Sequence, residues 1–340
     1  MKNYRIAVLG STGVVGREMI RLIEAGGIPA ELVPLGSARS AGSTIEFHGE
    51  PVTVREATGN SFFGADFVLG AAKNAVARLF APAIAESGAV FIDNSSAFRL
   101  MDDVPLVVPE INGADAFSHH GIIANPNCST IIALMAAAPL NRLSRIETMT
   151  ACTYQAVSGA GQEGLTELMR QTADVAAGRS VESHVFPAQI ACNVIPFIGA
   201  EQPNGYTDEE MKMQNEGRRI LHSPELRVNC TCVRVPVLRS HSESITLEFE
   251  RDITVDEARE ALAAAPGVKL VDDMDAADAQ DRYPMPLFTS DQDLIWAGRV
   301  RRDISNPEAA RGITFWCCGD QIRKGAATNA VQIAKLLTEE

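Results

Sequence analysis

The chain has 340 residues, which is too long for one typical core and suits two domains. Apolar residues make up 46% and charged residues 21% of it, values that are ordinary for a soluble globular protein. The net charge of −13 argues against general nucleic-acid binding, which needs clustered lysine and arginine. The sequence has neither a signal-peptide core nor an apolar run near the roughly 20 residues of a membrane helix, so we expect a cytoplasmic protein.

The first residues have the order strand, glycine loop, helix. Residues 4–9 predict a short buried strand, GSTGVVG follows at residues 10–16, and apolar residues at helical spacing continue to the stop at Gly26 and Gly27. This context is the one that a dinucleotide fingerprint requires, because glycines let the backbone approach a pyrophosphate at a helix N-terminus. The spacing Gly-x-x-Gly-x-x-Gly is imperfect, so a plain tight turn stays open. The predicted cofactor-binding residues here are Gly10, Ser11, Thr12, Gly13, Val14 and Val15.

The second predicted strand, residues 31–35, indicates which dinucleotide is bound. No Asp or Glu stands at its end to take a ribose hydroxyl. Ser37, Arg39 and Ser40 stand there instead, and these side chains suit a 2′-phosphate. The sequence therefore favours NADP(H) over NAD. A solvated loop cation is the alternative interpretation of Arg39.

Further apolar runs at residues 67–69, 90–92 and 122–124 alternate with helical stretches. Such alternation predicts a parallel sheet with crossover helices. Polar residues follow two of these runs, at 93–96 and at 125–128, where the carboxyl ends of parallel strands form ligand sites. The second of these segments, NPNC, places Cys128 beside the expected cofactor cleft.

Cys128 is expected at the N-terminus of a helix of about a dozen residues, because Pro126 stops strand pairing and the apolar run IIALMAAAPL follows. The helix dipole at that position favours thiolate over thiol. A thiolate beside a nicotinamide suits aldehyde oxidation or acyl reduction through a thioester. Asn127 would direct its amide, or the backbone, at the developing oxyanion.

His241 is the strongest candidate for a general base. The other histidines lie in polar or turn-rich surroundings typical of the surface, whereas His241 stands where the run RVPVLR meets polar residues before the strand restarts. Arg234 lies seven residues earlier, and an odd offset in a regular strand would put the two side chains on opposite faces. If both face one site, the strand must break between them, and Pro236 with Ser240 permits this.

The middle of the chain predicts a second domain of a different class. Long strand-like runs at 147–156, 228–238 and 244–251 occur with helices that open on the capping boxes Thr207 to Glu210 and Thr254 to Glu257. We expect an α+β domain with a mostly antiparallel sheet. The chain as a whole has seven cysteines, an odd number with no Cys-x-x-Cys pair, so neither a disulfide framework nor a zinc ribbon is indicated.

Eight segments between residues 10 and 334 carry a resemblance to one family: GSTGVVG, SARSAG, DNSSAFR, NPNCST, YQAVSGAG, EEMK, RVPVLRSH and KGAATNAVQIA. In this order they resemble the aspartate-β-semialdehyde dehydrogenases of the bacterial type, and the resemblance covers essentially the whole chain. It implies reversible NADPH-dependent reduction of L-aspartyl 4-phosphate to the semialdehyde and phosphate. This reaction belongs to the branch leading to lysine, threonine, methionine and isoleucine.

The resemblance also implies roles for individual residues. The catalytic set is Cys128 as nucleophile, His241 as general acid/base, Gln155 to orient the acyl intermediate, and Asn127. The substrate set is Arg234 for the α-carboxylate, Glu209 for the α-amino group, and Lys212 and Arg99 for the phosphate. The nicotinamide neighbours are Ser158, Gly159, Gly161 and Asn329. Without the resemblance, Glu209 and Lys212 are an i, i+3 surface pair, and Arg99 is a loop cation near Asp102 and Asp103.

The family likeness places the last helix back in the nucleotide domain. We therefore expect a discontinuous, Rossmann-like NADP-binding domain at 1–128 and 325–340, and a catalytic and dimerisation domain at 129–324. A homodimer is expected, with small-molecule substrates, no metal, no nucleic acid and no membrane partner. Two alternatives stay open: an N-acetylglutamyl-phosphate reductase, whose cysteine typically has a Gly-Cys-Tyr-Pro context unlike Asn-Cys-Ser here, and a non-catalytic NADP-binding regulator.

Overall fold

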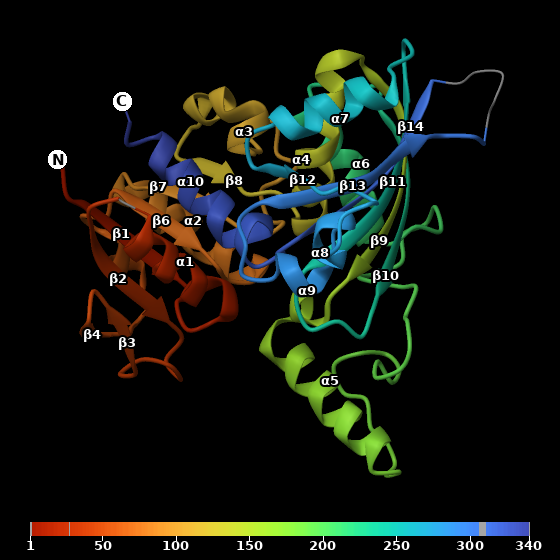
Figure 1. Ribbon diagram of the computed structural model, residues 1–340. Helices are drawn as coiled ribbons and strands as arrows, with labels where there is room; N and C mark the ends of the chain where they lie inside the picture. The colour runs from red at the N-terminus through yellow and green to blue at the C-terminus, as the bar shows by residue number, and fades with distance from the viewer. Residues whose placement is uncertain (1, 27, 306–310, 340) are drawn as a thin grey trace. The chain divides into compact units, whose positions relative to one another are not determined.

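The computed structural model describes residues 2–26, 28–305 and 311–339, and the chain divides into two compact units (Figure 1). Unit 1 consists of Met1–Asn127 together with Ala326–Glu340, and unit 2 consists of Cys128–Gly325. The two ends of the chain therefore belong to the same unit. No helix in the described part of the chain is long and apolar enough to cross a membrane.

Unit 1 is built on a parallel sheet of six strands in the order β5-β2-β1-β6-β7-β8. The central strands are short apolar runs that are buried on both faces, as the sequence predicted for a parallel sheet. The Rossmann-like prediction is thereby confirmed. The strands are β1 (Tyr4–Leu9), β2 (Ala30–Gly36), β5 (Arg55–Glu56), β6 (Phe67–Gly70), β7 (Val90–Asp93) and β8 (Ile122–Ala124), and a hairpin of β3 (Thr44–Phe47) and β4 (Glu50–Thr53) stands apart.

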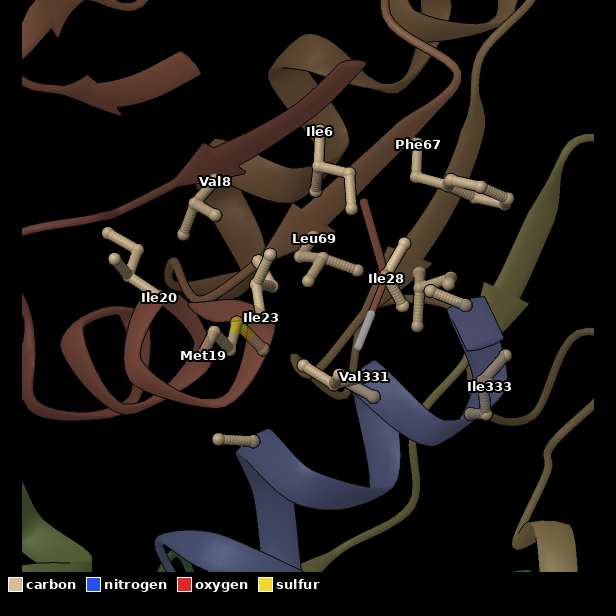
Figure 2. Packing of buried hydrophobic residues seen from close by; sticks show 14 of the residues in the cluster. Ile6, Val8, Met19, Ile20, Ile23, Ile28, Phe67, Leu69, Val331 and Ile333 are labelled. Carbon is tan, nitrogen blue, oxygen red and sulfur yellow. The ribbon is translucent and has the colours of Figure 1, made fainter. Parts of the chain in front are cut away.

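Two helices from opposite ends of the chain share one core in unit 1. Figure 2 shows α1 (Val14–Ala25) and α10 (Thr328–Leu336) packed beside the same strands. Apolar residues at helical spacing on the two helices, such as Met19 of α1 and Ile333 of α10, share this core with alternate strand residues. The strand residues include Ile6 and Val8 of β1 and Leu69 of β6. The other helices of unit 1 are α2 (Asn74–Ser87) and α3 (Pro109–Asn112), with short 3₁₀ turns at Gly59–Phe62 and Gly113–Ser118.

The glycine loop after β1 is held in a conformation that excludes other residues. Gly10 has φ +88°, and a Cβ atom there would lie 2.6 Å from the backbone oxygen of Ala71. Gly13 caps α1, whose first turn contains no acidic side chain. No side chain of the first turn neutralises the positive end of the helix dipole, which can therefore bind an anion from outside the helix.

Unit 2 contains a mixed sheet in the order β10-β9-β11-β14-β13-β12. The pairings β9–β11, β11–β14 and β14–β13 are antiparallel, and β10–β9 and β12–β13 are parallel. The prediction of a mostly antiparallel sheet is confirmed. The strands are β9 (Ile146–Gln155), β10 (Arg227–Arg234), β11 (His241–Phe249), β12 (Val268–Leu270), β13 (Ile295–Arg302) and β14 (Gly312–Gly319).

The helix α4 (Cys128–Leu143) is buried over nearly its whole length against this sheet and against α6 and α7. It has 16 residues rather than about a dozen, because the helix continues past the apolar run through Asn141 and Arg142. Both predicted capping boxes are confirmed, at the starts of α6 and α7. The remaining helices are α5 (Gly161–Ala176), α6 (Asp208–Ile220), α7 (Val255–Ala264), α8 (Ala279–Arg282) and α9 (Pro286–Thr289); short turns lie at Val157–Ala160 and Arg323–Ala327.

Candidate active site

A pocket of about 440 Å³ in unit 1 opens at the carboxyl ends of β1, β2 and β6. Of the predicted cofactor residues it is lined by Gly10, Thr12, Gly13, Ser37 and Ser40. Its position beside the glycine loop and the α1 N-terminus fits a dinucleotide, with the backbone N–H groups facing the pyrophosphate.

The other residues predicted for this loop region have different positions. Ser11 is fully buried and donates from its hydroxyl to the Leu35 carbonyl at 3.0 Å, so it ties β1 to β2. Val14 and Val15 are half-buried in the first turn of α1 and lie outside the pocket lining. Arg39 is exposed beside Ser40 and also lies outside the lining.

A buried amide cluster lies at the carboxyl ends of β7 and β8 in unit 1. The Asn125 side chain donates to Asn94 Oδ1 at 2.9 Å and accepts from Asn329 Nδ2 at 2.7 Å. Arg99 is buried against the same segments, where its guanidinium donates to the carbonyls of Asn94 and Asn125 at 2.7 and 2.9 Å. Asn127, also buried, follows directly in the chain. Arg99 is therefore a buried cation at the carboxyl-end edge of the sheet, not a solvated loop residue.

Cys128 is the first residue of α4, as predicted, and its thiol is partly exposed. The first turn of α4 contains no acidic side chain, so the helix dipole favours a thiolate there. Gly325 crosses close by: a Cβ atom on it would lie 3.0 Å from the Cys128 Cβ. The thiol thus has the surroundings of a nucleophile, whereas Cys230, Cys232, Cys317 and Cys318 are buried, as the sequence indicated.

Three of the predicted residues form a hydrogen-bonded chain in unit 2. Gln155, at the end of β9, donates from Nε2 to Glu209 Oε1 at 3.2 Å. Glu209, in the first turn of α6, accepts from the Lys212 ammonium on its other oxygen at 2.8 Å. The i, i+3 ion pair between Glu209 and Lys212 exists, but the Glu209 side chain is only 10% exposed, which an ordinary surface pair would not be.

Arg234 is the last residue of β10 and is buried. Its Nη1 donates to the Ala156 carbonyl at 2.6 Å, and its guanidinium lies 5.9 Å from the centre of the Phe186 ring. Burial lowers its pKa, while the negative charges of Glu209 and Cys128 raise it again. Arg234 is therefore near enough to both groups for electrostatic interaction with each.

His241 is the first residue of β11 and is completely buried. Its Nδ1 accepts a hydrogen bond from the Ala156 N–H at 3.1 Å, so the neutral ring carries its proton on Nε2. That Nε2 has no hydrogen-bond partner among the residues that the structure describes. Burial and the charge of Arg234 lower the pKa of His241 to about 3, with Glu209 acting in the opposite direction.

The strand break that the sequence required is present. β10 ends at Arg234, β11 begins at His241, and Ser240 between them has φ +71°. Gly159 shows that the two side chains converge, because a Cβ atom on it would lie 2.8 Å from Arg234 Nη1 and 3.3 Å from His241 Nε2. Glycine at this position leaves open the space in front of the imidazole and the guanidinium.

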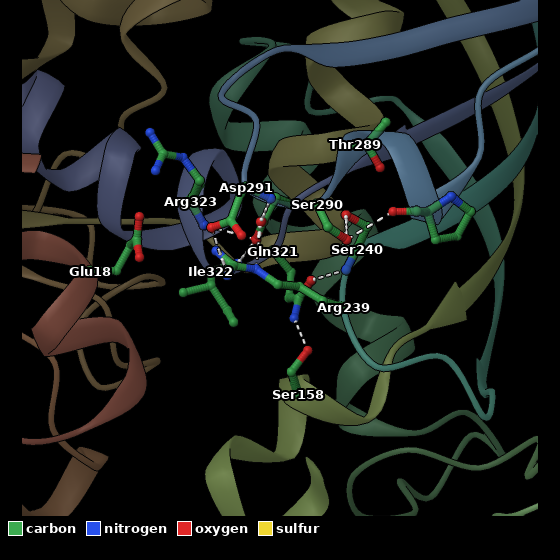
Figure 3. A network of polar contacts seen from close by, with 12 residues as sticks. Glu18, Ser158, Arg239, Ser240, Thr289, Ser290, Asp291, Gln321, Ile322 and Arg323 are labelled. Atoms are coloured by element: carbon green, nitrogen blue, oxygen red, sulfur yellow. Dashed lines mark hydrogen bonds and ion pairs between the residues drawn. The ribbon is translucent and has the colours of Figure 1, made fainter. Parts of the chain in front are cut away.

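The sequence did not identify Gln321, which connects two parts of this site (Figure 3). Its Oε1 accepts from the Ser240 backbone N–H at 2.9 Å, and its Nε2 donates to the Ser158 hydroxyl. Asp320 beside it forms an ion pair with Arg239 at 2.6 Å. This turn thereby fixes the residue that precedes His241. Ser158 is buried, and Gly161, three residues later in the chain, has φ +79°.

Glu243 is a second group that the sequence did not single out. It lies two residues after His241 in β11, on the same face of the sheet, and is fully buried. Neither carboxyl oxygen has a hydrogen-bond partner within the described part of the chain. Burial, together with Cys232 and Glu209, raises the pKa of Glu243 well above its usual value. Ionisation of this side chain is therefore disfavoured in the folded protein.

Glu243→Gln is expected to stabilise the protein at alkaline pH. Above pH 4.5 the folded protein holds the Glu243 proton more strongly than the unfolded chain does, so this residue lowers the free energy of unfolding as pH rises. The amide has no proton to lose, so we expect a gain in the free energy of unfolding that is larger at pH 8 than at pH 5. Denaturant unfolding at both pH values measures it. Glu260→Gln, at an exposed position on α7, should show no such pH dependence.

Family models match both units. Residues 5–119 match the NAD binding domain of semialdehyde dehydrogenases, and residues 137–324 match their dimerisation domain. Aspartate-semialdehyde dehydrogenase from Synechocystis sp. is 46% identical and covers 98% of this chain and 97% of its own length. The Bacillus subtilis protein of that name is 43% identical, with coverage of 99% and 98%.

Solved structures give the same result. Aspartate semialdehyde dehydrogenase II from Vibrio cholerae, complexed with ASA, superposes with a TM-score of 0.95 at 40% sequence identity. It covers 100% of this chain and 99% of its own. A probable aspartate-semialdehyde dehydrogenase from Pseudomonas aeruginosa gives a TM-score of 0.91 at 28% identity, with coverage of 100% and 99%.

Proposed function

The chain belongs to the aspartate-semialdehyde dehydrogenase family, and from that premise we propose that it reduces L-aspartyl 4-phosphate to L-aspartate 4-semialdehyde and phosphate with NADPH, reversibly, in the biosynthesis of lysine, threonine, methionine and isoleucine. The observation that carries the proposal is the convergence of the His241 imidazole and the Arg234 guanidinium at Gly159, with Arg234 in electrostatic reach of Cys128. A nucleophile, an acid/base group and a carboxylate-binding group are thus present in one unit.

Substrate recognition follows from charge. The α-carboxylate of aspartyl phosphate would pair with Arg234, whose planar guanidinium can bind both carboxylate oxygens. Glu209 is the partner proposed for the α-amino group, and Lys212 and Arg99 are the cations proposed for the phosphate. Because the protein carries a net charge of −13, these few cations determine where an anionic substrate is held.

The first chemical step is formation of a thioester. The Cys128 thiolate attacks the acyl carbon, a carbon–sulfur bond forms, and the bond to the phosphate oxygen breaks as phosphate leaves. Asn127 is proposed to donate to the oxyanion, and Gln155, fixed by Glu209, to orient the acyl group.

Reduction of the thioester releases the aldehyde. Bound NADPH supplies hydride to the thioester carbon. The Nε2–H of His241 is proposed to protonate the alkoxide oxygen that results; the imidazole then takes the hydroxyl proton back as the carbon–sulfur bond breaks, which releases the aldehyde and regenerates the thiolate. A carboxylate bound to Arg234 offsets the guanidinium charge, which is one cause of the low pKa of His241. Substrate binding therefore raises the pKa of this imidazole towards the working pH.

The cofactor proposal depends on the pocket in unit 1. The glycine loop and the α1 N-terminus are proposed to hold the pyrophosphate, and Ser37, Arg39 and Ser40 to hold the 2′-phosphate. Gly10, Thr12 and Gly13 line this pocket, and Ser11, Val14 and Val15 are the remaining residues proposed for the same loop and first helical turn. Ser158, Gly159, Gly161 and Asn329 are the proposed neighbours of the nicotinamide.

Phosphate-dependent reduction of NADP by L-aspartate semialdehyde tests the proposal. We expect an increase in absorbance at the NADPH band that requires aldehyde and phosphate together, with a lower rate when NAD replaces NADP. N-acetylglutamate semialdehyde, offered in parallel, should give no comparable rate. Preference for that acetylated aldehyde would support an N-acetylglutamyl-phosphate reductase instead, and inactivity with both would support a non-catalytic NADP-binding protein.

We further propose a cytoplasmic homodimer. The matched dimerisation domain supports the dimer, and the face of the mixed sheet opposite α4 carries a pocket of about 510 Å³ bordered by Thr150, Asn229 and Thr246. A second copy packed on this face would cover it. Light scattering of the purified protein should give twice the chain mass of 36.4 kDa.

A further inference from the structure

A segment of unit 2 without regular structure depends on two side chains of α5. The described residues 182–195, here called the strap, form no helix or strand, so their backbone N–H groups need other partners. Glu167 supplies an acceptor for three of them: its carboxylate accepts from the N–H groups of His184, Val185 and Phe186 at 2.8, 2.8 and 3.2 Å.

Gln171, one turn further along α5, holds the next part of the strap. Its Oε1 accepts from the N–H groups of Ile190 and Ala191 at 2.8 and 3.1 Å. Its Nε2 donates to the Glu182 carbonyl at 3.1 Å. Both α5 side chains are buried, so water cannot readily replace these hydrogen bonds, and losing them would lower the stability of the strap.

The far part of the strap is bonded to Arg234. Ile195 donates its N–H to the Arg234 carbonyl at 2.9 Å and accepts from the Arg234 N–H at 2.8 Å. Phe186, at the near part, places its ring 5.9 Å from the guanidinium. Phe186 and Ile195 share a buried apolar cluster with Leu168 of α5. The backbone and the side chain of Arg234 are thus both held by a segment whose conformation α5 determines.

We propose that Glu167 and Gln171 are positioning residues for the substrate carboxylate, acting through the strap on Arg234. This inference rests on the proposed function, in which Arg234 binds the α-carboxylate. The chain of contacts runs from Glu167 to the Phe186 backbone, and from the Phe186 ring to the guanidinium. A second route runs from Gln171 through the strap to Ile195 and the Arg234 backbone.

The charge of Glu167 matters to this role. Burial would raise the pKa of Glu167, but the three backbone N–H groups and Arg170 lower it, so the side chain is a carboxylate in the folded protein. A carboxylate has only acceptor sites, whereas a glutamine amide would turn an NH₂ group towards one of the strap N–H groups. Glu167→Gln therefore changes the strap with almost no change in side-chain volume.

The test compares two aldehydes in phosphate-dependent NADP reduction: L-aspartate semialdehyde and 3-aminopropanal, which lacks the α-carboxylate. The ratio of their kcat/KM values measures carboxylate recognition and does not depend on the fraction of active protein in a preparation. For Glu167→Gln we expect this ratio to fall about 10- to 100-fold, because a displacement of about 1 Å at a positioning group has effects of that size. The KM for NADP and the rate with 3-aminopropanal should stay near the wild-type values.

Two further variants and a control complete the experiment. Phe186→Leu keeps an apolar side chain but loses the ring over Arg234, and should lower the ratio about 3- to 5-fold, the effect of a cation–π contact of about 1 kcal/mol. Glu167→Asp keeps the charge on a shorter arm and should restore part of the ratio. Glu163→Gln removes an exposed carboxylate from the same helix and should leave the ratio unchanged.

Arg234→Lys separates failure of this proposal from failure of the proposed function. If Arg234→Lys lowers the ratio and Glu167→Gln does not, the strap has no part in carboxylate recognition and the inference is wrong. The same conclusion follows if Glu167→Gln slows both aldehydes equally, as a merely structural residue would. If Arg234→Lys itself leaves the ratio unchanged, the role of Arg234 in the proposed function is wrong, and with it the inference.

Discussion

Cys128→Ser is expected to lower phosphate-dependent NADP reduction by roughly 1,000-fold or more, because removing a covalent nucleophile affects every later step. A hydroxyl at the α4 N-terminus stays protonated near neutral pH, whereas the helix dipole favours ionisation of the thiol. The expected chemical signature is an acyl-enzyme. Wild-type protein incubated with aldehyde and NADP, without phosphate, should gain the mass of one aspartyl group, and the variant should gain none.

Cys152→Ser is the matched control for this substitution. Cys152 is also partly exposed and is also in unit 2, but it lies three residues before Gln155 in β9 and so faces the other side of the sheet. Its rate and its acyl-enzyme mass should equal those of the wild type. A Cys128→Ser protein that turned over within tenfold of the wild-type rate would rule out thioester catalysis by this residue.

His241→Ala is expected to lower kcat about 100- to 10,000-fold, the usual contribution of a well-placed acid/base group. The variant should stay slow but not inert, because Cys128 and Arg234 are retained. With L-aspartyl 4-phosphate, thioester formation should still be detectable by mass, since attack of the thiolate on the acyl carbon does not require the imidazole proton. Stopped-flow measurement of NADPH formation separates the two half-reactions.

The pH profile gives an independent check on His241. With its pKa lowered to about 3 by burial and by Arg234, the free imidazole stays neutral from pH 5 to 8, so kcat/KM should show no ionisation of an ordinary histidine near 6.5. The profile of kcat is expected to show a higher pKa, because the bound carboxylate offsets the charge of Arg234. His120→Ala, at an exposed position, should change neither profile. A limb near 6.5 in kcat/KM of the wild type that disappears in His241→Ala would contradict the assigned pKa.

Features with a local signal were predictable from the sequence. The glycine loop, the helix that begins at Cys128 and the capping box at Thr207 each depend on residues within a few positions of one another. The break between Arg234 and His241 was predictable for a different reason, since an odd offset on one strand contradicts a shared site. These patterns indicate Cys128, Arg234 and His241, whereas most of the other candidate site residues were assigned through the family resemblance.

Features that depend on strand pairing were not predictable. Glu243 alternates with serines in SESIT, a pattern that is also typical of a solvent-facing strand, and only its register against Thr153 and Cys317 shows that it is buried. Gln321 acts through segments that are distant in sequence. Glu167 did carry a signal, because it lies on the same helical stripe as Gly164 and Leu168, where a charged residue in an apolar row indicates a buried bonding role.

The shared core of unit 1 has a consequence for how the protein is made. Val331 and Ile333 of α10 are part of the core that covers β1 and β6, yet they are translated after the whole of unit 2. The apolar face of β1 and β6 in the nascent sheet therefore stays uncovered while all of unit 2 emerges from the ribosome and begins to fold. Synthesis of α10 closes that face, so folding of the nucleotide-binding unit is completed only after unit 2 has been synthesised.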